Sequence, residues 1–73
     1  MTEKELLYKI ARRIKEIREL KGIPQQNLAA KLEFDKSTMS RLESGKLNMR
    51  IATLYKVAQA LEIHLTDIIR IED

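Results

Sequence analysis

Apolar residues that recur at three- and four-residue steps constrain the fold of this chain more than any other feature. Such spacing places them on one side of a helix. The first run comprises Leu7, Ile10, Ile14, Ile17 and Leu20, and the second comprises Ile51, Leu54, Val57, Ala58 and Leu61. No segment alternates apolar and polar residues over the length of a strand. The sequence therefore predicts an all-α protein.

Start and stop signals predict five helices. Thr2 and Glu5 have the spacing of a capping box, so the first helix starts there, and Gly22 suits its left-handed end. Pro24 fits the first turn of a second, short helix. That helix would turn three residues inward: Leu28, Ala29 and Leu32.

The later helices have similar signals. Asp35 can cap a third helix that ends at Ser44-Gly45 and turns Met39 and Leu42 toward the core. A fourth helix covers the second apolar run. Thr66 starts a fifth, short helix, with Asp67 in its first turn.

The length allows one domain, residues 1–73, with a single core. Cysteine is absent, which excludes disulfides and thiolate metal sites, so stability must come from helix packing or self-association. No stretch approaches the roughly 20 apolar residues of a membrane span. We expect a cytoplasmic protein without membrane contact.

Positive charge is concentrated in the middle of the chain. The net charge is +3, but residues 9–50 hold eleven Lys or Arg against five acids, and both flanks are acidic. This distribution favours a nucleic-acid partner. On the first helix we interpret the basic face as solvated, with Arg12 or Arg13 as a less favoured phosphate contact.

The segment 25–44 has the pattern of a helix-turn-helix. Two short helices meet near Glu33-Phe34, and Ala29 leaves room for them to cross closely. The second helix presents Lys, Ser, Thr, Ser and Arg outward, side chains that suit the base edges and phosphates of a DNA major groove.

In these features the chain resembles the Cro and phage-repressor type helix-turn-helix family, also called the xenobiotic-response-element family. The resemblance implies a five-helix, lambda-repressor-like DNA-binding domain. It rests on residues in the family's order and spacing: Gly22-Ile23, Gln25, Leu28-Ala29, Ser37, Met39 to Lys46, Thr53-Leu54, Val57-Ala58, Ala60-Leu61 and Asp67 to Ile69.

The resemblance also implies roles for individual residues. The base-reading positions are Lys36, Ser37, Ser40 and Arg41, with Thr38 as a further base or phosphate partner. Phosphate contacts fall to Gln25, Lys46 and Asn48. Glu43 matches a structural glutamate of the family and is not expected to contact DNA.

Three positions depart from the family pattern. Glu33 stands where glycine is usual, so either Glu33 adopts a left-handed conformation or the turn differs. Pro24 replaces a Ser or Thr cap. Met49 replaces a frequent proline, which leaves Leu47 and Met49 as apolar residues in a loop.

A cluster of isoleucines near the C-terminal end has two interpretations. A short helix cannot turn Ile68, Ile69 and Ile71 into one small core, so at least one should be exposed. We favour a homodimer contact there, together with Leu47 or Met49, over a single exposed apolar residue.

Catalysis, metal binding and cofactors are not expected. His64 is the only histidine and has no second ligand at chelating spacing, and no glycine-rich phosphate loop is present. Tyr8, Phe34 and Tyr55 are too few for single-strand stacking and are expected in the core or at its edge.

The sequence thus predicts a sequence-specific regulator of transcription, of the repressor type, that binds double-stranded DNA as a homodimer on an inverted repeat. No segment for a small-molecule effector is evident. The alternative is a protein-interaction module on the same fold, an antitoxin or an adaptor, because a fold does not fix a function.

Overall fold

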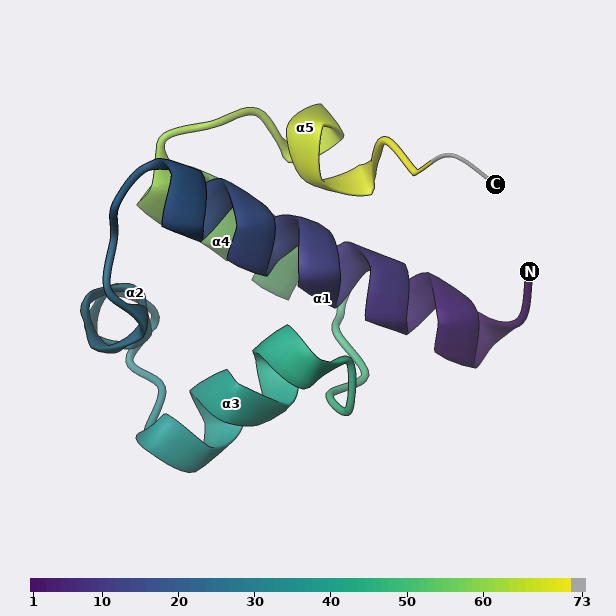
Figure 1. The fold of residues 1–73 in the computed structure, drawn as a ribbon, viewed down its shortest axis with the longest axis horizontal. Coiled ribbons are helices and arrows are strands. Elements are labelled where there is room, and N and C mark those ends of the chain that lie inside the picture. Colours follow the sequence, from purple (N-terminus) through teal and green to yellow (C-terminus); the bar gives the residue numbers. More distant parts are fainter. Residues whose placement is uncertain (72–73) are drawn as a thin grey trace.

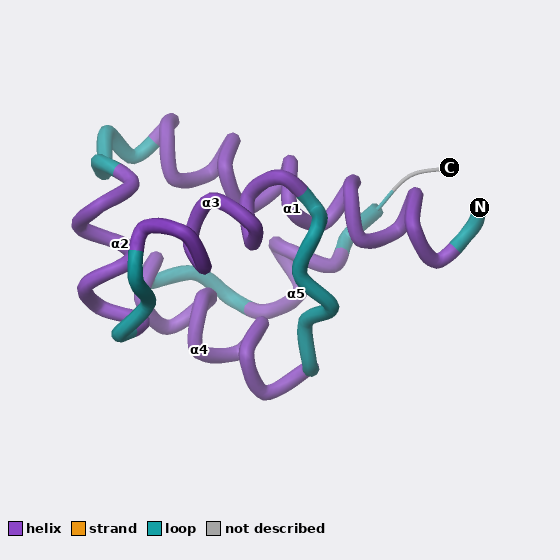
Figure 2. The backbone as a smooth tube through the Cα atoms, turned by 90° about the horizontal axis from the view of Figure 1, so that it is seen from below, coloured by secondary structure: helices purple, strands orange, loops and turns teal. Residues whose placement is uncertain are grey.

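A computed structural model describes residues 1–71 of the chain. It contains α1 (Glu3–Leu20), α2 (Gln25–Leu32), α3 (Lys36–Ser44), α4 (Ile51–Leu61) and α5 (Leu65–Ile69). Within these residues every regular element is a helix, and short loops join the helices (Figure 2). The predicted all-α, five-helix fold is confirmed.

The long helix α1 is the centre of the arrangement. Figure 1 shows α3 on one side of α1 and α5 on the other, with α4 behind it and α2 across its C-terminal end. Both α3 and α5 pack against α1, and α2 and α5 pack against α4. The two helices of the predicted motif, α2 and α3, therefore sit on a scaffold made by the other three.

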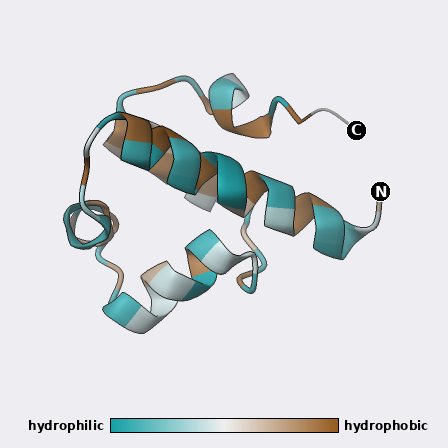
Figure 3. Ribbon diagram, in the orientation of Figure 1, coloured by the Kyte–Doolittle hydropathy of each residue, from teal (hydrophilic) through white to brown (hydrophobic). Residues whose placement is uncertain are grey.

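All five helices contribute to one core. Its fully buried large side chains are Ile14, Leu28, Met39, Leu42, Val57, Leu61 and Ile68. Apolar faces turn inward in Figure 3, while the outward faces are largely hydrophilic. Each such aliphatic side chain stabilises the fold by about 1.5–3 kcal/mol relative to an exposed position.

The predicted ends of α1 are confirmed. The Glu5 amide donates to Thr2 Oγ1 at 3.1 Å and the Thr2 amide donates to Glu5 Oε1 at 3.3 Å, which completes the capping box. Beyond the helix, Gly22 has a φ of +68°. The predicted apolar stripe is wrong at Leu20, which is 79% exposed. The buried side of α1 ends with Ile17 and Arg18, and Leu20 lies on the other side of the helix.

The turn between α2 and α3 decides between the two alternatives for Glu33. This residue has φ 59° and ψ 36°, the left-handed conformation, at the C-cap of α2. Glu62 takes the same conformation after α4. The turn therefore keeps its glycine-like geometry although a glutamate occupies it.

Two details of α4 and α5 differ from the prediction. Ile51 is 63% exposed, because it is the first residue of α4 and lies beyond the edge of the core. The fifth helix starts at Leu65 rather than Thr66, and the His64 amide donates to Asp67 Oδ2 at 3.0 Å. No helix among the described residues is long and apolar enough to cross a membrane.

Candidate nucleic-acid interface

Both ends of α3 are fixed by specific residues. At its start the Thr38 amide donates to Asp35 Oδ1 at 2.7 Å, and hydrogen bonding from Thr38 lowers the pKa of the Asp35 carboxyl. At its end Gly45 has a φ of +78°, and a Cβ there would lie 2.8 Å from the Tyr8 Cα. A glycine is thus required for α3 to end this close to α1.

The inner and outer faces of α3 have different side chains. Met39 and Leu42 are fully buried, as predicted. The residues predicted to read bases are exposed on the opposite face: Lys36, Ser37, Ser40 and Arg41.

One shallow hollow unites this outer face with the following loop. It has a volume of about 630 Å³ and is lined by Lys36, Ser37, Ser40, Arg41, Ser44 and Lys46. The fold therefore brings the four predicted base-reading residues together with Lys46, a predicted phosphate contact. Thr38 is half-buried, and Asn48 is exposed in the loop without lining the hollow.

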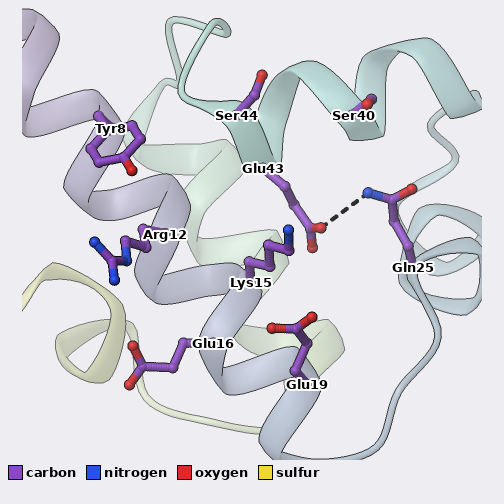
Figure 4. Close-up of a pocket in the computed structure, with 9 residues that line it drawn as sticks. All are labelled: Tyr8, Arg12, Lys15, Glu16, Glu19, Gln25, Ser40, Glu43 and Ser44. Carbon is purple, nitrogen blue, oxygen red and sulfur yellow. Dashed lines mark hydrogen bonds between the residues drawn. The ribbon is translucent and has the colours of Figure 1, made fainter.

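Gln25 opens α2, and its side chain is held from within the fold. Its Nε2 donates to Glu43 Oε1 at 3.0 Å, a contact drawn in Figure 4. Pro24 supplies no side-chain cap, and the Asn27 amide donates to the Pro24 carbonyl at 3.0 Å, so the Gln25 and Gln26 amides remain available to an anion. Sequence reasoning placed Gln25 at a phosphate but missed its partner Glu43.

A buried ion pair joins α1 to α3. Arg18 Nε donates to Glu43 Oε2 at 2.6 Å and Nη2 donates to Glu43 Oε1 at 3.1 Å, while Nη1 donates to the Ile23 carbonyl at 2.7 Å. Both side chains are buried. Glu43 agrees with its expected structural role, whereas the role of Arg18 was missed. Its position four residues after Ile14, on the apolar side of α1, was the available signal.

The three isoleucines predicted at a dimer contact occupy different environments. Ile68 is fully buried in the core, so it has no surface to offer a second copy. Ile69 is 41% exposed, and Ile71 is half-buried against the core. Leu47 and Met49 also pack against the core.

Two aromatic side chains lie outside the predicted core. Tyr8 and Tyr55 are each more than half exposed, while Phe34 is half-buried. Tyr55 follows the exposed Ile51 by one turn of α4, so these two residues form an apolar pair at the surface. Among residues 1–71 no group of three His, Cys, Asp or Glu side chains could hold a metal ion.

Comparisons with known proteins agree with this arrangement. The family model described as "Helix-turn-helix" matches residues 14–68. A relative from Archaeoglobus fulgidus, an uncharacterized HTH-type transcriptional regulator, is 33% identical over 61 residues, which are 84% of this chain and 87% of that protein. The antitoxin HipB of Escherichia coli is 32% identical over 57 residues, 78% of this chain and 65% of that protein.

A solved structure is similar along most of its length. The restriction-modification controller protein C.AhdI from Aeromonas hydrophila superimposes with a TM-score of 0.79 at 32% sequence identity, covering 85% of this chain and 94% of that one. The residues that the family model matches include α2, α3 and α4 together with the C-terminal part of α1. The chain therefore belongs to the Cro and phage-repressor type helix-turn-helix family of DNA-binding transcriptional regulators.

Proposed function

We propose that this chain regulates transcription by inserting α3 into the major groove of specific double-stranded DNA sites. The observation that carries the proposal is the exposed outer face of α3, where Lys36, Ser37, Ser40 and Arg41 line one hollow with Lys46. An α-helix fits the width of the major groove, and these side chains can donate to base edges and phosphates.

Specificity and affinity come from different residues in this proposal. Arg41 and Lys36 can donate to guanine acceptors, while Ser37, Thr38 and Ser40 suit either bases or phosphates. Lys46 and Asn48 follow the DNA backbone from the loop after α3. Gln25 and the uncapped start of α2 bind a further phosphate, since a helix N-terminus favours an anion.

We further propose that two copies bind an inverted repeat, with their α3 helices about 34 Å apart. Exposed apolar side chains on two neighbouring helices support a contact between copies. They are Ile51 and Tyr55 on α4 and Ile69 on α5, which packs against α4. This surface replaces the predicted one that included the buried Ile68. A cytoplasmic location belongs to the same proposal, because the regulator needs access to DNA.

Selection of binding sites from a random duplex library, at near-physiological salt, tests the function directly. We expect an enriched inverted repeat with half-sites about one helical turn apart. Enrichment of a single half-site would support sequence-specific DNA binding but contradict the proposed binding of two copies. Salt-sensitive binding with no enriched sequence would contradict the proposed function, because phosphate contacts alone explain such binding.

The second candidate is a protein-interaction module of the antitoxin kind. Similarity to the antitoxin HipB favours it, as do the exposed Ile51 and Tyr55. In that case the α4 surface would meet a different protein instead of a second copy. A chain that stays monomeric in solution and enriches no sequence would favour this candidate.

A further inference from the structure

The part of α3 that carries Ser40 and Ser44 lies between two hollows. The first is the hollow that Lys36, Arg41 and Lys46 help to line. The second lies between α3 and α1 and has a volume of about 560 Å³. Ser40 and Ser44 line both of them. The helix α3 is therefore a ridge with a depression on each side.

One stripe of α1 builds most of the second hollow. Tyr8, Arg12, Lys15 and Glu19 recur at four- and three-residue steps, which places them on one side of the helix. Figure 4 shows Lys15 and Glu19 on the side of α1 that faces α3, with Gln25 at one end of the hollow, while Arg12 lies at its other edge and extends away from α3. The start of α2 thus closes the hollow.

The hollow is lined by two cations and three acids, but two of the acids are already paired with other arginines. Among residues 1–71 the exposed side chains of Arg12 and Lys15 make no hydrogen bond or ion pair. Glu16 is occupied by Arg13 at 3.3 Å, and Glu43 is occupied by Arg18. Glu19 is the remaining acid, at the C-terminal end of the stripe. Two cations are therefore available to an anionic ligand.

We propose that this hollow is a second phosphate-binding subsite, in which Arg12 and Lys15, with the Tyr8 hydroxyl, bind the DNA strand on the α1 side of the groove. The inference rests on the proposed function, because it requires α3 to enter the major groove. That groove, about 12 Å wide, is bounded by two sugar-phosphate strands, so a ridge inserted there has one strand over each flank. Lys46, in the loop after α3, would contact the strand on the other side of α3.

The basic face of α1 is then only partly a solvated surface. Two of its cations, Arg12 and Lys15, contact one DNA strand while Lys46 contacts the other, so α3 keeps a fixed position in the groove. Phosphate contacts of this kind fix orientation but carry no sequence information. Their loss should weaken binding by the same factor on every sequence.

Salt dependence of DNA binding tests the subsite. The probes are the duplex selected by the wild-type chain and an unrelated duplex, titrated between 50 and 200 mM salt. For Lys15→Gln and for Arg12→Gln we expect the slope of log K against log salt to fall by about 0.9 each. Binding should weaken roughly tenfold per contact near 0.1 M salt, equally on both duplexes.

Arg70→Gln and Lys56→Gln are the matched controls. Because Arg70 lines a hollow that also contains Arg12, it is a control for Lys15 only, and there it should leave the slope unchanged. Lys56→Gln, in a hollow between α2 and α4 without any proposed contact, is the control for both cations. Tyr8→Phe removes only the hydroxyl and should cause a smaller, sequence-independent loss. Circular dichroism of each variant confirms that it folds.

The outcomes separate the two proposals. If the wild-type chain selects a duplex but Lys15→Gln and Arg12→Gln keep its salt slope, the subsite is wrong and the proposed function stands. If either variant loses affinity only on the selected duplex, that residue reads bases, and the phosphate assignment is wrong. If the wild-type chain selects no sequence, both proposals fail.

Discussion

At the scale of single residues, the exposed side chains of α3 should differ in what they contribute to DNA binding. Arg41 lies on the outer face, where a guanidinium can donate two hydrogen bonds to a guanine. We expect Arg41→Ala to relax the preference at one base pair by about 1–3 kcal/mol. Affinities for the selected site and its single-base variants measure this preference. Equal loss on every sequence would instead identify Arg41 as a phosphate contact.

Lys46→Ala is the comparison variant for Arg41→Ala. Lys46 lines the same hollow from the loop after α3, where the DNA backbone should pass. Its removal should weaken all sequences alike and lower the salt slope by about 0.9. An unchanged slope would exclude Lys46 from the phosphate contacts.

The buried pair Arg18–Glu43 allows a prediction about stability. Arg18→Met would leave the Glu43 carboxylate buried without its cationic partner, with only the Gln25 amide donating to it, and such losses cost about 3–5 kcal/mol. The double variant Arg18→Met, Glu43→Leu should recover much of that free energy, because no unpaired charge remains. Urea unfolding of the four proteins in this cycle provides the measurement. A double variant no more stable than Arg18→Met would contradict the role of the unpaired charge.

At the scale of helices, the cap of α3 should make stability depend on pH. Hydrogen bonds from Thr38 lower the pKa of Asp35 below its ordinary value of 3.8. A lowered folded-state pKa means that the stabilisation is present above the ordinary value and is lost as pH falls through the lowered one.

Asp35→Asn keeps a capping oxygen without the charge. The stability advantage of the wild-type chain over this variant should therefore shrink as pH falls below about 4. Urea midpoints of the two proteins between pH 2.5 and pH 7 measure the difference. A constant difference across that range would show that ionisation of Asp35 contributes nothing to the cap.

The turn that follows α2 is strained at Glu33. A side chain in the left-handed conformation costs about 1 kcal/mol, whereas glycine adopts it freely. Glu33→Gly should therefore raise the free energy of unfolding by about 1 kcal/mol. Glu33→Ala removes the carboxylate but keeps the Cβ, so it should bring no gain. If alanine stabilises as much as glycine, the carboxylate rather than the backbone carries the cost.

At the scale of the whole molecule, assembly depends on apolar surface that one copy cannot bury. Tyr55→Lys places a charge on the exposed part of α4 and should shift the chain toward monomer. Binding to the full inverted repeat should weaken much more than binding to a half-site. Sedimentation velocity measures the first effect and titration the second.

Leu20→Lys is the control for the assembly experiment, because Leu20 is 79% exposed on α1, outside the α4 and α5 surface. It should leave the oligomeric state unchanged. If both variants dissociate the protein equally, the contact between copies is not specific to α4. If neither does, the proposed surface is wrong.

Local signals in the sequence were sufficient for the fold class, the helices and most of their ends. The Thr2–Glu5 capping box, the Asp35 cap and the Gly45 stop each act through neighbours within a few residues, so they can be recognised without the fold. Helical spacing likewise predicted that Met39 and Leu42 face the core while Ser40 and Arg41 face outward. These properties depend on backbone hydrogen bonds and on periodicity, which are local in the chain.

Only the tertiary structure decided which apolar and charged side chains are covered. Leu20, Ile51 and Tyr55 lie outside the core, while Ile68 lies inside it and Arg18 reaches Glu43 across 25 positions of the sequence. The hollow between α1 and α3 likewise joins residues that are far apart in the sequence, next to the close approach of Gly45 to Tyr8. Burial and pairing depend on where distant helices cross, and periodicity gives the face of a helix but not what covers it.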